Sequence, residues 1–402
     1  MEEVLKRLGP ESSSRLLRLR REGWEKFNSL PWPLKTDEEW RRTDPDSFRW
    51  EPAGFDPKEA LQVSFETPAP EWIRSGVIVT DLSTALRQFP DLMEKHLFRT
   101  GRPLGLAKHV SLHEALWRQG VFVFVPDGVK IPTPLRVRIS ESAGALAFFP
   151  HVVIVMGRRS EATLIDERIG AAGGGNPAFS DEMVEISVGE EGTLRYIHLQ
   201  QWGENISEIY TQRTEIARDA SFLNIHAALG AKATKAQIET ILQEKGAQAD
   251  LLGVLFGSDS QHFDFHTVQD HRSGQTRSDL LYKSALKDSS KAVYTGLIRI
   301  EKQAQKSDAY QANRNLLLSD GASADSVPML EILADDVRCT HGVAVGPVDQ
   351  DQIYYLNSRG LAPAEAEHLI VEGFFEQILQ RIPAEELRER LMSELKRRLN
   401  GA

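Results

Sequence analysis

The chain has 402 residues, of which 41% are hydrophobic and 26% charged, a composition typical of a globular protein with a large core. Its formal net charge of -10 argues against nucleic acid as the main partner, because phosphate binding needs a basic surface. No apolar run approaches the roughly 18 residues that a membrane helix needs. The charged N-terminus also lacks the apolar core of a signal peptide, so we expect a cytoplasmic protein with no membrane partner.

A single cysteine, Cys339, limits the chemistry further. It permits no intrachain disulfide, which suits a reducing compartment. It also cannot supply the four thiolates that an iron–sulfur cluster usually takes. If the chain handles such a cluster, other ligands must come from a second chain or from side chains other than cysteine.

Residues 1–119 are charged and mixed in pattern, and three helices are expected there. Apolar residues recur at helical spacing up to about residue 29, with a break near Gly9 and Pro10. Two further helices are predicted over 83–97 and 112–119. We therefore assign residues 1–119 to an N-terminal helical and mixed region.

From about Gly120 the pattern changes to short strands separated by turns rich in Gly, Asp, Ser and Asn. The predicted strands are 121–125, 135–139, 151–156, 162–165, 193–199, 209–216, 221–229, 238–242, 250–256, 262–268, 278–286, 293–300, 330–333 and 337–345. The lack of a helical stretch among them argues against βαβ units and leaves a sandwich, a barrel or a β-solenoid. The number of strands favours coils stacked around a narrow core, and we assign this β region to residues 120–355.

The last part of the chain, residues 356–402, returns to helical spacing. Pro363 opens one predicted helix and Pro383 a second. The second carries a leucine stripe with a spacing of four residues, formed by Leu387, Leu391, Leu395 and Leu399. Two short helices do not stabilise each other well alone. We expect this C-terminal helical region to pack on the β body or on a partner.

Two segments that resemble ligand-binding motifs favour simpler interpretations. The glycine-rich run 170–175 is followed by neither a Gly-Lys-Ser/Thr sequence nor a helix, so we interpret it as a hairpin tip and expect no nucleotide hydrolysis by this chain. The pair Asp335 and Asp336 could bind metal or do acid–base work. Between two predicted strands, such a pair is more often part of a turn.

Cys339 and His341 are the first candidate site. Strand side chains alternate faces, so both residues are expected to point the same way. A thiol beside an imidazole can ligate a soft metal, or it can act as a nucleophile with its base. The alternative is a buried apolar cysteine next to a hydrogen-bonded histidine.

His262, Asp264 and His266 form the second candidate site. On a strand they share one face and could hold a metal through nitrogen and oxygen ligands. The alternative is a polar ladder on the outside of a β coil. If they do bind a metal, the chain could be a metal-dependent β-solenoid enzyme, which is the competing hypothesis for its function.

A long collinear set of residues resembles the SufB/SufD family, the scaffold proteins of the SUF iron–sulfur cluster assembly system. The matching segments are Tyr294-Thr-Gly-Leu-Ile-Arg-Ile300, Asp308-Ala-Tyr-Gln-Ala-Asn313, Leu316-Leu-Leu-Ser319, Pro328-Met-Leu-Glu-Ile332, Cys339-Thr-His-Gly342 and Tyr355-Leu-Asn-Ser-Arg-Gly360. Within the family the chain is more similar to the SufD branch. SufB-type chains carry a cysteine where this chain has Ile332, whereas the Cys-x-His-Gly arrangement is the SufD pattern.

The resemblance implies a right-handed parallel β-helix core between helical end regions. It implies a non-enzymatic scaffold that pairs with a SufB paralogue through the β-helix, and with the ABC-type ATPase SufC through the C-terminal helices. A homodimer is expected to be possible in isolation. No cofactor is expected to bind stably to the chain alone, but a transient iron–sulfur cluster is expected in the complex. His341 matches the functional histidine of the SufD branch, and the role of Cys339 is left open between ligand and structural residue.

Overall fold

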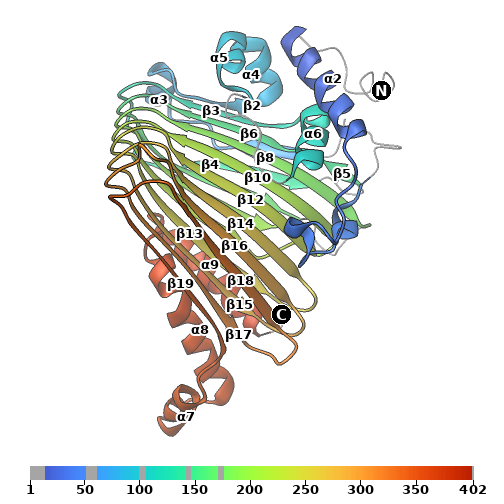
Figure 1. The fold of residues 1–402 in the computed structure, drawn as a ribbon, viewed down its shortest axis with the longest axis vertical. Helices are drawn as coiled ribbons and strands as arrows, with labels where there is room; N and C mark the ends of the chain where they lie inside the picture. The colour runs from blue at the N-terminus through green and yellow to red at the C-terminus, as the bar shows by residue number, and fades with distance from the viewer. Residues whose placement is uncertain (1–13, 51–60, 99–105, 142–145, 171–175, 401–402) are drawn as a thin grey trace.

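The computed structural model describes residues 14–50, 61–98, 106–141, 146–170 and 176–400. Its body is a flattened solenoid of two facing β-sheets, with helical regions at the N-terminal and C-terminal parts of the chain (Figure 1). Successive strands from β8 onward alternate between the two sheets, so each pair of strands completes one coil. Neighbouring coils pair in parallel and in register, as between Tyr210 of β10 and Ala236 of β12. The predicted parallel β-helix core is confirmed.

Each sheet runs from one end of the solenoid to the other. In spatial order, sheet A contains β1 (Leu61–Phe65), β4 (Leu135–Glu141), β7 (Glu161–Ile169), β9 (Thr193–Gln201), β11 (Ser221–Ala228), β13 (Gln248–Gly257), β15 (Arg277–Leu286), β17 (Asp308–Leu317) and β19 (Arg338–Pro347). Sheet B contains β18 (Ser323–Ile332), β16 (Lys291–Ile300), β14 (His262–His271), β12 (Ala233–Leu242), β10 (Ile206–Ile216), β8 (Ala178–Val188), β6 (His151–Met156), β3 (Gly120–Val125) and β2 (Ile78–Asp81), with β5 (Ala147–Phe148) paired to β8.

Several strands are not predicted by the sequence pattern. They are the short strands β1, β2 and β5 and the long strands β8 and β17. Polar side chains conceal the two long ones: β8 buries Asp181 and Glu182, and β17 buries Gln311, Asn313 and Asn315. Apolar alternation cannot detect a strand whose inward positions carry polar side chains, such as Glu182 of β8 and Asn313 of β17, that find polar partners across the interior or on a neighbouring coil. The glycine-rich run 170–175 lies almost entirely outside the described residues.

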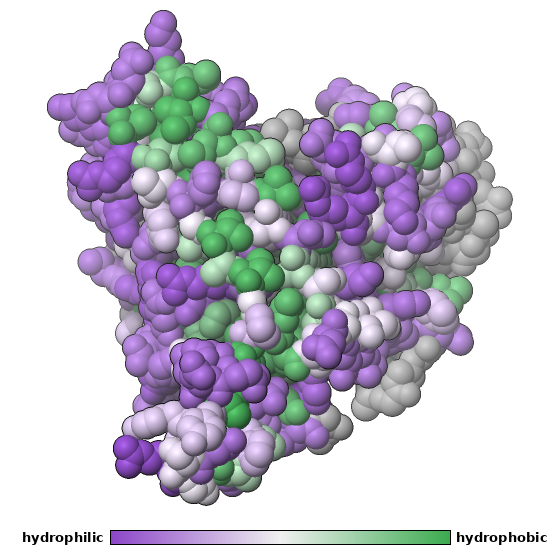
Figure 2. All heavy atoms as spheres, turned by 60° about the horizontal axis from the view of Figure 1, so that its bottom comes forward, coloured by the Kyte–Doolittle hydropathy of each residue, from purple (hydrophilic) through white to green (hydrophobic). Residues whose placement is uncertain are grey.

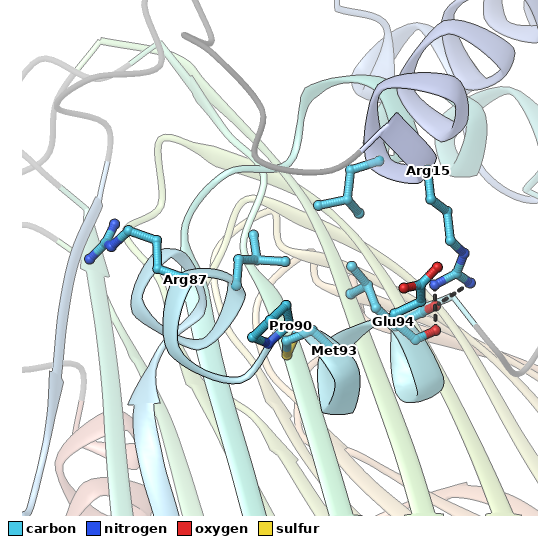
Figure 3. Close-up of a pocket in the computed structure, with 8 residues that line it drawn as sticks. Arg15, Arg87, Pro90, Met93 and Glu94 are labelled. Atoms are coloured by element: carbon cyan, nitrogen blue, oxygen red, sulfur yellow. Dashed lines mark hydrogen bonds between the residues drawn. The ribbon is translucent and has the colours of Figure 1, made fainter.

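The N-terminal region closes the first coils. Its helices are α2 (Ser14–Ser29), α3 (Pro70–Arg74), α4 (Leu82–Gln88), α5 (Pro90–His96) and α6 (Ala107–Leu116), with short 3-10 helices η1 (Glu38–Trp40) and η2 (Pro45–Phe48). The single helix expected over 83–97 is two helices, because Pro90 starts α5 and Phe89 lies between them in a non-helical conformation. A pocket of about 320 Å³ lies between α2, α4 and α5, where Arg15 donates to the carbonyls of Glu94 and Leu97 (Figure 3).

The C-terminal region consists of α7 (Gln350–Ser358), α8 (Pro363–Leu379) and α9 (Glu385–Leu399). The predicted leucine stripe of α9 is buried, and with Phe375 and Ile378 of α8 it packs against the outer face of sheet A. The platform that these helices require is therefore the β body. In contrast, α7 buries none of its residues and projects from the end of the molecule (Figure 1). Across the described ranges, no helix is both long and apolar enough to span a bilayer.

Candidate functional site: the open end of the solenoid

The last coil of the solenoid has no covering layer among the described residues. Its strands β18 and β19 are the terminal strands of their sheets and pair with one neighbour each. Side chains that point inward in earlier coils are buried, but here Leu330 and Ile332 of β18 are 39% and 40% exposed and Val343 and Val345 of β19 are 45% and 44% exposed. Figure 2, in which the lower end of Figure 1 comes forward, shows hydrophobic side chains gathered among polar ones on this side of the molecule.

Cys339 and His341 lie on β19 at this open end. The parallel register sets Cys339 beside Ala309 and His341 beside Gln311, both of which are buried on the inner face of β17. By strand alternation, both candidate side chains therefore face the interior side of the last coil. The pair contributes a half-buried thiol and an exposed imidazole to one uncovered surface.

The surroundings of the two groups differ. The Cys339 side chain packs against a small apolar cluster that includes Ile298, Ile300 and Ala309. Burial raises the pKa of the Cys339 thiol, and the Asp308 carboxylate raises it further. The thiol is therefore protonated at neutral pH and is a weak ligand until a metal or a cation lowers its pKa. His341 is exposed at the edge, with its ring accessible to a partner.

A layer of amides supports this surface from the preceding coil. The Gln311 side chain donates to the carbonyl of Gly296 across the interior at 3.2 Å, and Asn313 donates to the carbonyl of Tyr282 at 3.3 Å.

Asp335 and Asp336 lie beside the site, in the exposed bend between β18 and β19. The Asp336 carbonyl accepts from the Lys306 N–H of the preceding coil, and the Asp336 N–H donates to the Gln305 side chain. Both contacts hold the bend in place through its backbone, which confirms the turn interpretation of this acidic pair.

The second candidate set lies on the outer face of sheet B, beneath the N-terminal segment. His262, Asp264 and His266 share one face of β14, and His266 Nε2 lies 3.0 Å from Asp264 Oδ1. Asp264 is already paired with the Lys235 ammonium at 2.6 Å, and it also accepts from the Thr43 hydroxyl. Burial alone would raise the pKa of Asp264, but Lys235 and His266 hold it well below its usual range. A lysine thus occupies the position where a metal would bind this carboxylate.

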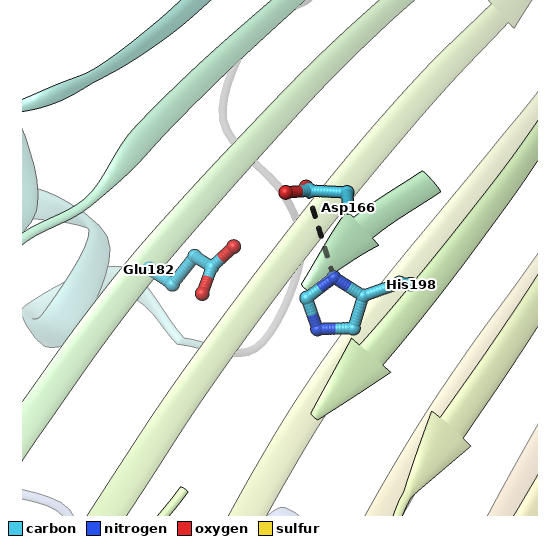
Figure 4. Close-up of side chains that lie close together, drawn as sticks. All are labelled: Asp166, Glu182 and His198. Atoms are coloured by element: carbon cyan, nitrogen blue, oxygen red, sulfur yellow. Dashed lines mark ion pairs between the residues drawn. The ribbon is translucent and has the colours of Figure 1, made fainter. Parts of the chain in front are cut away.

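A third cluster, which the sequence did not reveal, lies inside the solenoid. Asp166, Glu182 and His198 are fully buried, and their ligand atoms lie within 4.8 Å of one another (Figure 4). The Arg168 guanidinium lies between the two carboxylates, donating to Glu182 Oε2 at 2.8 Å and to Asp166 Oδ2 at 2.9 Å. The predicted strand ends at residue 165, too early to include Asp166 and Arg168. The alternation of these two charged residues along the strand would have been the signal for the buried cluster.

The charges of this cluster favour an ion network over a metal site. Burial alone would raise the pKa of Asp166, but Arg168 holds it far below its usual range. Burial raises the pKa of Glu182 to about 7 and lowers that of His198 to about 4. The guanidinium already supplies the cation that the carboxylates need, so a divalent ion would add uncompensated positive charge in a fully buried position.

The fold and this end surface define a parallel β-solenoid protein with helical regions at both ends and an uncovered last coil. Comparison with known families identifies it further: residues 137–374 match the SufBD core domain of SUF-system iron–sulfur cluster assembly, and residues 63–137 match the SufBD N-terminal region. The chain belongs to the SufBD family of iron–sulfur cluster assembly proteins.

Relatives from both branches of the family are similar to the chain. The iron–sulfur cluster assembly protein SufD of Bacillus subtilis is 32% identical over 81% of this chain and 74% of that protein. A SufBD family protein of Pyrococcus horikoshii is 31% identical over 78% of this chain and 70% of that protein. SufB of Bacillus subtilis is 27% identical over 83% of this chain and 71% of that protein. The higher identity to SufD than to SufB from the same organism agrees with the apolar Ile332 and the Cys-x-His-Gly arrangement.

Proposed function

We propose that this chain is a SufD-type scaffold subunit, which pairs through the open end of its solenoid with a SufB-type paralogue and builds iron–sulfur clusters together with an ABC-type ATPase. The observation that carries the proposal is the uncovered last coil. Its exposed apolar residues and the outer edges of its two terminal strands are the features that another β-chain would cover. Cys339 and His341 lie within that surface.

In this proposal His341, with Cys339 as a secondary group, offers a ligand or a proton-handling group to a cluster formed between two chains. One cysteine is too few to hold a cluster, so the remaining ligands come from the partner. The cluster is cargo and leaves the complex. The raised pKa of the Cys339 thiol favours His341 as the earlier ligand, because a neutral imidazole binds metal without first losing a proton.

The C-terminal helices are the proposed docking site for the ATPase. Tyr354 and Tyr355 of α7 are 76% and 56% exposed, and Leu369 of α8 is 49% exposed. The helix α7 contributes no buried residue to the fold. The exposure of these apolar groups is therefore explained by binding and not by stability. The competing hypothesis of a metal-dependent enzyme has less support, because Lys235 already neutralises Asp264.

The test is replacement of His341 by alanine in cells that depend on the complete assembly system. We expect iron–sulfur enzyme activity to fall at least about ten-fold while the complex still assembles, as for loss of a metal ligand or its support. Thr340→Ala is the matched control, since Thr340 is exposed on the opposite face of the same strand. Normal maturation with His341→Ala would refute the role of His341. Failure of the chain to co-purify with a SufB-type paralogue would refute the scaffold assignment.

A further inference from the structure

A buried chain of hydrogen bonds joins α6 to the outer face of sheet B, away from the open end. His113 Nδ1 of α6 lies 2.8 Å from the Asp181 carbonyl, and His113 Nε2 lies 2.9 Å from His151 Nδ1. His151 Nε2 lies 3.1 Å from Glu185 Oε2, which also accepts from the Phe98 backbone N–H at 2.7 Å. Both histidines are fully buried, and Glu185 is nearly so.

The geometry of these contacts fixes how many protons the hydrogen-bonded groups must hold. Three contacts lie between a backbone carbonyl at one end and a carboxylate oxygen at the other, and each contact needs one hydrogen. Two neutral imidazoles supply two hydrogens. His113 must donate from Nδ1 because a carbonyl only accepts, so its Nε2 is an acceptor and His151 must donate from Nδ1. The contact between His151 Nε2 and Glu185 then lacks a hydrogen, unless this row of hydrogen-bonded groups holds one further proton.

The surroundings place this proton on His151. Glu185 Oε2 already accepts an N–H from Phe98, and an ionised carboxylate oxygen accommodates two N–H donors well. The rings of Phe98 and Trp117 lie 4.9 Å and 5.2 Å from the His151 ring, and aromatic rings stabilise a cation. Phe98 also has a φ of 51°, a backbone conformation rare for a bulky residue, and such strain persists where surrounding contacts impose it.

We infer that His151 and Glu185 form a buried proton-binding site that attaches the N-terminal helical region to the solenoid through an imidazolium–carboxylate pair. Among the described residues, His113 of α6 and Asp181 of β8 face this site, and the Arg20 guanidinium of α2 acts on His113. Asp181 is not the counter-ion, because its carboxylate lies 3.9 Å from His113 and burial raises its pKa well above the usual range. The N-terminal helical region is therefore held to the solenoid by a charge-assisted contact.

The experiment is nitrogen-15 NMR of the full chain with selectively labelled histidine, assigned through His113→Phe and His151→Phe. At about pH 7, above the ordinary pKa of histidine, we expect both ring nitrogens of His151 to be protonated and His113 to be the Nδ1–H tautomer. A His151 ring with one protonated nitrogen, or a His113 protonated at Nε2, would overturn the inference. The charge and tautomer states are read from the wild-type spectrum, and the two variants serve only to assign its signals.

Two variants on β8 test the assignment of the counter-ion. Glu185→Gln removes the carboxylate, so His151 should lose its second proton and amide hydrogen exchange in α6 should accelerate roughly ten-fold or more, as expected for loss of a charge-assisted hydrogen bond. Asp181→Asn is the matched control, because only the backbone carbonyl of that residue takes part in the chain. Loss of the imidazolium in Asp181→Asn, or its persistence in Glu185→Gln, would contradict the assignment.

Discussion

The two ends of the solenoid are finished in opposite ways. At the first end, β1 and β2 pair antiparallel with β4 and β3 and so end the parallel ladder, while Leu82 of α4 and Leu116 of α6 are completely buried. At the last end, the described residues place no such layer over β18 and β19, and apolar residues that would be core in any earlier coil are close to half exposed. Repeat proteins need a cap at each end to stay soluble. The chain supplies the cap at the first end itself, and in the proposed complex the partner would supply the cap at the last end.

The interiors of the two halves also differ. The half near the cap encloses the ion network of Asp166, Arg168 and Glu182, whereas the coils near the open end enclose neutral amides such as Gln311 and Asn313. A buried ion network tolerates little rearrangement, because any unpaired charge is costly. Amides and small apolar groups can accept a new surface above them without that cost. We therefore expect substitutions to affect stability in the capped half and association at the open end.

The largest effect is expected from Arg168→Met in the capped half. This change leaves Asp166 and Glu182 together inside the solenoid without their cation, so the free energy of unfolding should fall by about 3–5 kcal/mol. Denaturant unfolding of the purified chain measures it. Arg159→Met is the control, because the Arg159–Glu191 pair is exposed and such pairs contribute little to stability. Equal losses in both variants would show that the interior network contributes no more than a surface pair.

The chemistry of the inward faces also explains which strands the sequence predicts correctly. Strands with apolar inward faces, such as β11, are predicted correctly because alternation reports burial directly. The strand β8 escapes prediction because its inward Glu182 is neutralised by Arg168, and only the fold brings that partner across the interior from β7 of the facing sheet. The orientation of Cys339 and His341 follows from alternation. Their exposure does not, since it depends on which coil is last and uncovered.

The next largest effect concerns the open end. Val343→Asp places a carboxylate in the middle of the exposed apolar surface, where covering it would require burial of an unpaired charge. Affinity for a SufB-type paralogue, or for a second copy of the chain, should fall about 100-fold, which corresponds to about 2.7 kcal/mol. Analytical ultracentrifugation of the mixed chains measures the association.

A matched control separates this surface from the rest of β19. Thr340→Asp adds the same charge on the outward face of the strand and should leave association within about two-fold. The unfolding free energy of the isolated chain should be nearly unchanged in both variants, because both positions are exposed. Unaltered association of Val343→Asp would mean that this end is not the interface.

A smaller effect is expected on the helical arm beside the open end. Replacing Tyr354 and Tyr355 by serine should weaken binding of the ABC-type ATPase about ten-fold, because exposed aromatic residues often dominate interface energy. Stability should not change, since α7 buries no residue. Gln352→Ala on the same helix is the control, and calorimetric titration of the ATPase into each variant gives the affinity. Undiminished binding by the double variant would exclude α7 as the docking element.

The smallest effect tests how the C-terminal helices are attached to the β body next to the open coil. Lys283 of β15 donates to the Phe374 carbonyl of α8 at 2.6 Å, and its ammonium lies 5.0 Å from the Phe374 ring. Burial, aided by Arg314, lowers the pKa of Lys283 from 10.5 to about 8. Between these two values the unfolded chain binds a proton that the folded chain has released, so stability rises with pH in this range.

Lys283→Met should remove this rise and therefore distinguishes Lys283 from every other group that titrates at alkaline pH. We expect the wild-type chain to gain about 1 kcal/mol more than the variant between about pH 7.5 and pH 10, which is less than the full pKa shift implies because solvent screens part of the charge. Denaturant unfolding at both pH values measures the difference. The direction of the change in stability is more informative than its size. An exposed lysine has the same pKa in the folded and unfolded chains, so it gives no rise of stability with pH. Identical pH profiles of the wild-type chain and the variant would show that Lys283 remains hydrated in the folded chain. The contact that attaches α8 would then be open to solvent, like the last coil, and not buried, like the capped end.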